Sequence, residues 1–146
     1  MRGDGAEIDT NLSKEKNLSE VLDNLPSGGG GSAVVRQIGN ENRAVAVQVG
    51  GYGNRMLTEQ VGDRNRALHL QVGADNDTRL GQYGDDNTNA LVARDGVAGP
   101  GGGTFFLDIR GSGVDGFSID ATGPQAYRGY TVSPNGTGGL NITAHQ

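Results

Sequence analysis

Side-chain amides recur in this sequence at a fixed spacing. Four segments read Q-x-G-x-x-N, a fifth copy carries one inserted residue, and after four of the Asn residues the next Gln follows six positions later. An amide donates to one neighbour and accepts from another, so amides stacked in register can form ladders. The chemistry on offer is hydrogen bonding between repeated units. The amide residues of the pattern are Gln37, Asn42, Gln48, Asn54, Gln60, Asn65, Gln71, Asn76, Gln82 and Asn87.

The inventory for catalysis and metal binding is small. With two His residues and no Cys, the sequence lacks a thiol nucleophile and a thiolate metal site. Asp75 and Asp77 are spaced as in a calcium loop, but the required Gly and the closing Glu are missing. His69 replaces a small residue of the repeat, which favours a core variant or a weak pH sensor over a ligand or base. We expect no enzyme and no catalytic, cofactor-binding or metal site.

Short strands and tight turns must position the amides. The stretches NRAVAVQ, NRMLTEQ, NRALHLQ and NDTRLGQ lie between successive Asn and Gln residues and contain β-branched or aliphatic residues. They predict strands of about 20 Å. The pieces between Gln and Asn then form turns, in which Gly supplies positive φ or close backbone approach. The predicted turn glycines are Gly39, Gly50, Gly62, Gly73 and Gly84.

Strand and turn together repeat every 11 or 12 residues, so two of them make a coil of 22 or 23 residues. This period predicts an all-β protein, a β-solenoid with cross-β stacking at about 4.7 Å. A buried amide is satisfied only where the stack continues, since an unpaired one costs about 1–3 kcal/mol. Polymerisation is therefore favoured. The predicted ladders join Gln37 with Gln60 and Gln82, Gln48 with Gln71, Asn42 with Asn65 and Asn87, and Asn54 with Asn76.

Alternation along the strands predicts which side chains face inward. The outward set forms an apolar stripe suited to lateral packing between fibres, although a register error of one residue would exchange the two faces. The inward set is Ala44, Ala46, Met56, Thr58, Ala67, His69, Thr78 and Leu80. The outward set is Val45, Val47, Leu57, Leu68 and Leu70.

Acidic residues fall in or beside the predicted turns, and two interpretations stay open. Stacked like charges would slow assembly, as gatekeeper residues do. The same residue type is also an ordinary turn former. The residues are Asp63, Asp75, Asp77, Asp85 and Asp86.

The pattern resembles the curlin repeat of bacterial curli fibres, Q-x-G-x-x-N-x-A-x-x-x-Q. Residues 37–48 and 60–71 match every fixed position. Met56 and Thr78 stand in place of Ala in two further copies, and the copy that starts at Gln82 ends in Ala93 rather than Gln. The resemblance covers residues 34–93.

This resemblance implies a structural subunit or nucleator of an extracellular functional amyloid at the cell surface, within the biofilm matrix. Its partners would be copies of itself, a nucleator subunit and a secretion pore in the outer membrane. The sequence itself contains no apolar signal-peptide core at its start.

Composition divides the chain into three parts. Residues 1–33 are an N-terminal segment, with an amphipathic helix predicted at 17–25 and a Gly-rich linker after it. Residues 34–95 are the repeats. Residues 96–146 contain strand-like pieces that start near 104, 116, 126 and 139, and they predict degenerate coils or a C-terminal cap. Counting two degenerate coils, we expect about five in all.

Charge and hydropathy narrow the function further. The formal charge of −5 argues against nucleic-acid binding, and no stretch approaches the roughly 20 apolar residues of a membrane span. Gly accounts for 27 residues and aromatics for only 5%, so repeated polar contacts must replace a large apolar core. The alternative function is a monomeric β-solenoid binding module, such as an adhesin or a polysaccharide- or ice-binding protein.

Overall fold

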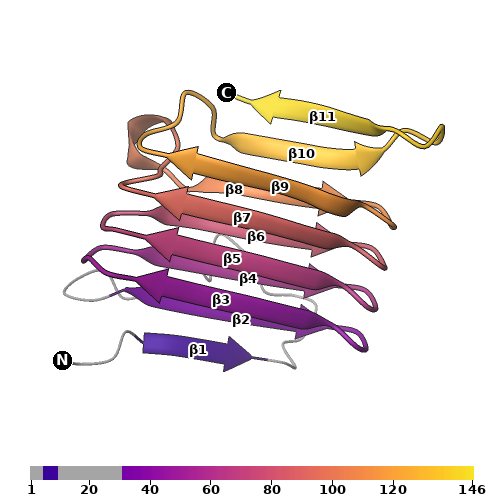
Figure 1. Cartoon of the computed structure of the whole chain (residues 1–146), viewed down its shortest axis with the longest axis horizontal. Helices are drawn as coiled ribbons and strands as arrows, with labels where there is room; N and C mark the ends of the chain where they lie inside the picture. Colours follow the sequence, from indigo (N-terminus) through magenta and orange to yellow (C-terminus); the bar gives the residue numbers. More distant parts are fainter. Residues whose placement is uncertain (1–4, 10–30) are drawn as a thin grey trace.

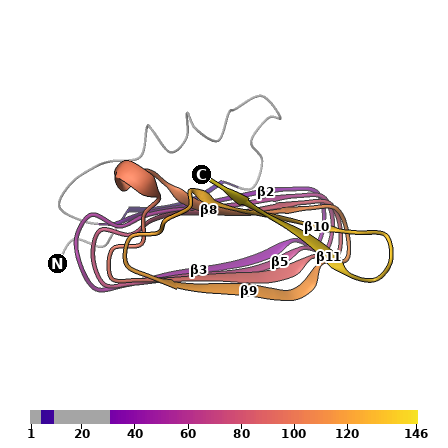
Figure 2. The same ribbon diagram turned by 90° about the horizontal axis from the view of Figure 1, so that it is seen from above.

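The computed structural model of the chain describes residues 5–9 and 31–146. These residues form a flattened β-solenoid, in which two sheets face each other and turns connect them (Figures 1 and 2). Sheet A contains β1 (Gly5–Asp9), β2 (Ser32–Ile38), β4 (Arg55–Val61), β6 (Asp77–Tyr83), β8 (Phe105–Arg110), β10 (Gly129–Pro134) and β11 (Leu140–His145), in that spatial order. Sheet B contains β3 (Arg43–Val49), β5 (Arg66–Val72), β7 (Thr88–Arg94) and β9 (Asp115–Thr122).

Parallel pairing one coil apart gives the predicted period. Strand β2 pairs with β4 so that Gln37 lies beside Gln60, and β4 pairs with β6 so that Gln60 lies beside Gln82. In sheet B the same pairing sets Gln48 beside Gln71. The predicted all-β solenoid is therefore confirmed, and its coils have 22 or 23 residues up to β6, whereas Gln82 and its partner Ile109 are 27 residues apart.

The described chain makes about four coils rather than the expected five. Coils 1 to 4 consist of β2 with β3, β4 with β5, β6 with β7, and β8 with β9. The strand-like pieces near 126 and 139 become β10 and β11, which form an antiparallel hairpin in sheet A. The chain reverses there because the side chain of Asn135 accepts hydrogen bonds from the backbone N–H groups of Thr137 and Gly139. Figure 2 shows β11 crossing the end of the solenoid diagonally.

The interior changes in composition along the solenoid axis. In coils 1 to 3 it contains small, polar and amide side chains, such as the fully buried Thr58, His69 and Gln60. In coil 4 it is apolar, with Phe105 and Leu107 fully buried. The predicted inward set is confirmed in β4, β5 and β6, where its members are buried. On the edge strand β3 the two inward alanines are half-buried.

The predicted outward set is only partly right. Val45, Val47 and Leu68 are exposed on sheet B. Leu57 was expected to be exposed as well, but it is fully buried. It lies on the outer face of sheet A, where Val34 beside it in the register is 3% exposed. This face is packed, whereas the prediction assumed that both outer faces meet solvent.

The helix predicted at 17–25 and residues 27–30 of the predicted linker lie outside the described residues. At the end of that linker, Ser32 already opens strand β2. The described part of the N-terminal segment also includes β1, which adds a parallel strand to sheet A next to β2.

Candidate functional site: the stacked amide ladders

The glutamines form two ladders inside the solenoid, one per sheet. In sheet A, Gln37 Nε2 donates to Gln60 Oε1 at 2.6 Å, and Gln60 Nε2 donates to Gln82 Oε1 at 2.8 Å. In sheet B, Gln48 Nε2 donates to Gln71 Oε1 at 2.9 Å. In each of these three bonds the donor is the more N-terminal glutamine, so the ladders have a direction. The part of these residues in an amyloid core stays a prediction.

Four of the five ladder glutamines also bond to the opposite sheet, among them Gln48, which donates to Ser32 O at 2.8 Å. The second N–H of Gln60 reaches the carbonyl oxygen of Arg43 at 3.0 Å, at the start of a sheet B strand. Gln82 does the same to Arg66 at 2.8 Å, and Gln71 donates to Arg55 at 2.6 Å in the other direction. The amide of Gln60 therefore bonds to the next coil through Gln82 and to the preceding coil through Arg43.

Both ladders end inside the chain. The register position after Gln71 is Ala93, and the position after Gln82 is Ile109. The last amides donate to other polar side chains instead, Gln71 to a residue of the next coil and Gln82 to one of its own coil. Gln71 Nε2 donates to Thr78 Oγ1 at 2.7 Å, and Gln82 Nε2 donates to Asn89 Oδ1 at 2.8 Å. Sequence reasoning treated Thr78 as a departure from the repeat and did not single out Asn89, although each follows its Gln by seven positions.

The asparagines occupy the corners, where they bond to backbone groups and also to one another, since Asn87 Nδ2 donates to Asn65 Oδ1 and Asn76 Nδ2 donates to Asn54 Oδ1, each at 3.0 Å. Asn65 illustrates the pattern: its Nδ2 donates to Gly84 O at 2.7 Å, one coil on, and its Oδ1 accepts from Asn87 N at 3.1 Å. Its own N–H donates to Asn42 Oδ1 at 3.0 Å. At the other corner, Asn54 Nδ2 donates to Gly73 O and Asn54 Oδ1 accepts from the backbone of Asn76. The asparagines thus fix the turns of successive coils to one another.

The turn glycines are required by close stacking of the turns. A Cβ at Gly62 would collide with the carbonyl oxygen of Gly84, and φ there is 120°. Gly39 meets Gly62 in the same way. Gly50 has open space beside it, and Gly51 makes the close approach instead. The residue inserted in this copy shifts the contact by one position.

Two features of the turns were missed by sequence reasoning. The residue before Asn adopts left-handed backbone, with φ from 56° to 58° at Glu41, Arg64, Asp75 and Asp86. Glu and Arg do not favour this region, so the turn geometry imposes it. A third ladder also runs along the turns. Asp63 Oδ1 accepts from Asn40 N at 2.7 Å, and Asp85 Oδ1 accepts from Asp63 N at 2.8 Å.

This third ladder bears on the turn aspartates that the sequence left open. Asp63 and Asp85 each accept a backbone N–H from the preceding coil, so both hold successive turns together. Asp86 instead forms a bidentate ion pair with Arg64 one coil back, at 2.7 and 2.8 Å. The hydrogen bond from Arg64 lowers the pKa of the Asp86 carboxyl. These contacts favour the turn-forming interpretation.

His69 lies at the centre of coil 2 between two threonines. Its Nδ1 is 2.9 Å from Thr58 Oγ1, and its Nε2 is 2.6 Å from Thr78 Oγ1. Burial lowers the pKa of His69 from its ordinary 6.5 to about 3, so the ring is neutral at physiological pH. Both ring nitrogens have partners within the core. His69 is therefore a satisfied core residue, as one of the two interpretations predicted.

The outer face of sheet A carries charged side chains that differ from coil to coil. Arg36 and Glu59 form an ion pair of 2.7 Å with both side chains under 5% exposed. The hydroxyl of Tyr83 donates to Glu59 Oε2 at 2.8 Å, and burial together with Glu59 raises the pKa of Tyr83. In the next coil Arg79 pairs with Asp108 at 2.7 Å. Opposite charges in adjacent strands favour this register over a shifted one.

The chemistry of these clusters is hydrogen bonding and ion pairing. Residues 5–9 and 31–146 contain no group of three or more His, Cys, Asp or Glu side chains that could hold a metal ion. In the same part of the chain, no helix has the length and apolar character needed to cross a membrane.

The fold and the ladders define a class: an all-β repeat solenoid whose coils are joined by side-chain amides and stacked turns. Residues 53–84, which include β4, β5 and β6, match the family model of the curlin associated repeat. The predicted resemblance to the curlin repeat is confirmed over these residues. No curated protein and no solved structure matches the chain significantly.

Proposed function

We propose that this chain is a structural subunit of an extracellular amyloid fibre, in which copies stack along the solenoid axis. The observation that carries the proposal is the in-register amide ladder, in which three coils of one chain are already joined as copies in a fibre would be. The curlin repeat match and the solenoid fold fit a curli-type structural subunit.

The first coil leaves ladder acceptors at its outer end. Gln37 Oε1 and Gln48 Oε1 receive no hydrogen bond from any described residue, whereas the corresponding oxygens of Gln60 and Gln71 are occupied. Edge strand β3 pairs on one side only, with β5. A coil from another copy would supply the donors that these groups lack.

The proposal includes the location of the fibre and its partners. It lies outside the cell in the biofilm matrix, its principal partner is another copy of the chain, and a nucleator subunit and a secretion pore are further partners. The curlin repeat match supports this setting.

The test follows assembly from denaturant. The full chain is diluted into buffer, amyloid-dye fluorescence is recorded over time, and fibre diffraction is collected on the product. A lag, a rise and a reflection near about 4.7 Å along the fibre axis are expected. A stable monomer with β-rich circular dichroism would reject the fibre.

Substitution of Gln37 and Gln71 by Ala should slow this assembly markedly, because both ladders lose a member. The control is Gln125→Ala, whose amide donates only to carbonyl oxygens two and three residues away. Equal kinetics for the two variants would contradict the ladder as the basis of assembly.

A monomeric binding module is the second candidate, and one observation favours it. Sheet A extends beyond sheet B through β1 at one end and β10 and β11 at the other. Strands of this kind cover the edges of a sheet and protect a monomer from association. The stable monomer described above would support this function.

A further inference from the structure

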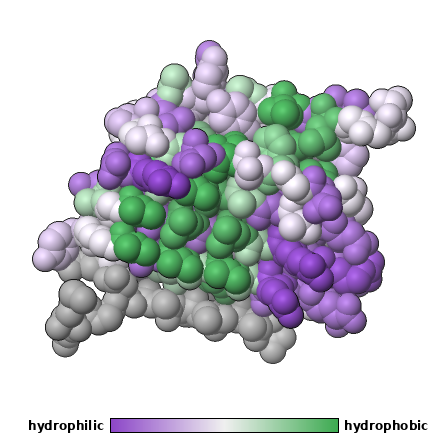
Figure 3. Space-filling model, viewed as in Figure 1, coloured by the Kyte–Doolittle hydropathy of each residue, from purple (hydrophilic) through white to green (hydrophobic). Residues whose placement is uncertain are grey.

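The outer face of sheet B is apolar and open. Val45 is 47% exposed, Val49 is 51% exposed, and Leu68 is 41% exposed. Figure 3 shows apolar side chains gathered over the strands of this sheet. A contiguous patch of exposed apolar side chains is typical of a binding surface.

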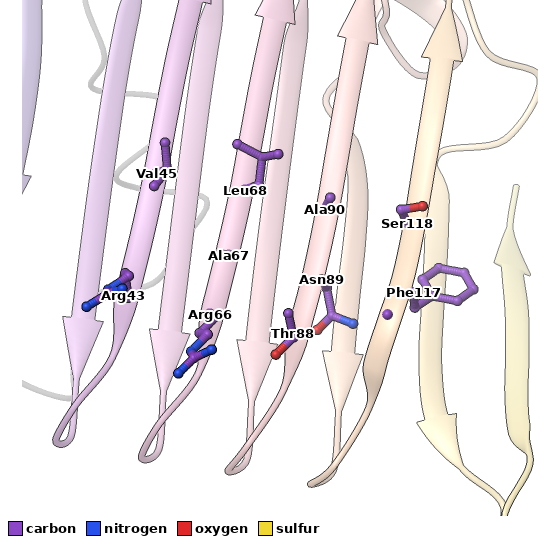
Figure 4. Close-up of a pocket in the computed structure, with 11 residues that line it drawn as sticks. Arg43, Val45, Arg66, Ala67, Leu68, Thr88, Asn89, Ala90, Phe117 and Ser118 are labelled. Atoms are coloured by element: carbon purple, nitrogen blue, oxygen red, sulfur yellow. The ribbon is translucent and has the colours of Figure 1, made fainter.

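A groove of about 360 Å³ crosses this face along the solenoid axis, lined by residues from β3, β5, β7 and β9. Val45, Leu68 and Ala90 lie in one row across the strands (Figure 4). At the β9 end the lining residues include the small Gly116 and Ser118 together with Phe117. Four adjacent strands span about 14 Å, which makes the groove long and narrow.

Two guanidinium groups stand at one end of the groove. Arg43 and Arg66 are direct partners in the register of β3 and β5, and both residues are exposed (Figure 4). Like charges that lie directly opposite each other in a sheet repel. Neither side chain forms an ion pair with a described carboxylate.

Five other arginines of the solenoid are arranged differently. Each meets a carboxylate one coil further on, and the pairs are Arg36 with Glu59, Arg55 with Asp77, Arg64 with Asp86, Arg79 with Asp108, and Arg94 with Asp120. Arg43 instead faces Arg66, and Arg66 faces Thr88. These two cations therefore lack the acid that the rest of the solenoid supplies.

We infer that the groove binds a single-chain anionic amphiphile of the fatty carboxylate class. The carboxylate bridges the guanidinium groups of Arg43 and Arg66, which match a planar anion. The chain lies along the groove over Leu68 and Ala90 toward β9. Asp115, which lies beside Thr88 in the register, carries a negative charge at the far end. That charge sets the direction of the ligand, because it disfavours an anion there.

The site does not rest on the proposed fibre, since the outer face of sheet B belongs to each folded copy. Binding and assembly can therefore fail separately. If the chain binds the amphiphile but never forms fibres, the binding site is supported and the proposed fibre is rejected. If the chain forms fibres but does not bind the amphiphile, only the proposed binding site is rejected.

The experiment titrates the folded full-length chain with dodecanoate below its micelle concentration, by calorimetry, while circular dichroism checks that the fold is intact. We expect saturable binding that weakens at least about tenfold in the variant with Arg43→Gln and Arg66→Gln. Ala90→Leu should weaken it as well by filling the groove, while both arginines remain. The matched control Arg64→Gln, a turn residue away from the groove, should bind normally.

Two ligand controls complete the test. Dodecyltrimethylammonium has the same chain with a cationic head, and butyrate has the head with a short chain. Both should bind much more weakly than dodecanoate. Equal binding of the cationic amphiphile, or unchanged binding by the double arginine variant, would overturn the inference.

Discussion

The repeat coils and the C-terminal coil share one backbone path but are held together differently. In the repeat coils, Gln60 and Gln71 stack on identical residues and hydrogen bond to them. Further along the axis the same positions in the register carry Ala93 in β7 and Ile109 in β8, and Val97 and Val114 replace the corner asparagines. The parallel pairing continues through this change.

The difference lies in what each interior needs from its neighbours. An amide in a ladder needs a polar partner on each side, either another Gln or, at the ladder ends, Thr78 or Asn89, so the repeat coils depend on their neighbours. The apolar side chains of coil 4 gain from burial alone and need no counterpart of their own kind. The backbone N–H groups of Val97 and Val114 still donate to Asn76 Oδ1 and Asn87 Oδ1. The last corner asparagines of the repeat coils therefore keep hydrogen-bond partners.

The largest expected effect comes from the apolar region. Phe105 is fully buried and its ring meets Tyr130 edge to face at 6.1 Å. Phe105→Ala should lower the free energy of unfolding by about 3–5 kcal/mol, measured by urea denaturation, because it leaves a cavity. Tyr52→Ala, at a 72% exposed side chain, is the control. Equal losses for the two variants would mean that coil 4 is not the anchoring core.

The second largest loss of stability is expected from a substitution in the middle of the glutamine ladder of sheet A. Gln60→Ala leaves Gln37 Nε2 without its acceptor and Gln82 Oε1 without its donor. A loss of about 3 kcal/mol is expected, since each unpaired buried group costs about 1–3 kcal/mol. Gln37→Ala, at the half-buried end of the same ladder, should cost less in the same assay. The reverse order would contradict the view that the interior of the ladder carries its stability.

Acid should weaken the repeat coils through His69. The unfolded chain binds a proton at this residue near pH 6.5, whereas the folded chain does so only near pH 3 because of burial. The unfolded state therefore holds more protons in between, and the free energy of unfolding falls as the pH drops below 6.5. From pH 7 to pH 5 the loss should be about 2 kcal/mol. Urea titrations at each pH measure it.

The control for this pH dependence is His69→Leu, which places at position 69 the residue type found one coil on at Leu91. Its unfolding free energy should lose this component of the slope between pH 7 and pH 5. An unchanged slope would assign the acid sensitivity to other groups.

The smallest effect is expected at the surface of the turns. Arg64 and Asp86 form a short bidentate pair, but both side chains are more than half exposed. Solvent and salt screen such pairs, so Arg64→Gln should leave the thermal midpoint almost unchanged. A large shift would show that the turn ladder, rather than the interior amides, holds the repeat coils together.

Regular spacing made the repeat coils predictable. The 22- and 23-residue intervals between Gln37, Gln60 and Gln82 specify which residues meet, because identical positions return one coil further along the axis. The same spacing places Thr78 and Asn89 at the ends of the ladders, because each follows its Gln by seven positions, but the sequence analysis did not recognise this role. The left-handed backbone at Glu41 was hidden, because nothing in a Glu residue favours it.

The C-terminal region resisted prediction for a different reason. The alternating pattern of 139–144 fits a strand, but alternation does not distinguish parallel from antiparallel pairing. The reversal depends on Asn135 and the glycines around it. The burial of Leu57 was equally hidden, since a strand pattern does not state whether its outer face is covered.

The unequal sheets constrain how copies can be tiled. Sheet A holds seven described strands and sheet B four. Copies translated along the axis until their A sheets joined would leave three rungs empty in sheet B at every junction, with β9 and the next β3 about 19 Å apart. A fibre with two unbroken sheets therefore requires β1, β10 and β11 to leave sheet A. Departure of these terminal strands from sheet A would then have to precede the stacking of copies.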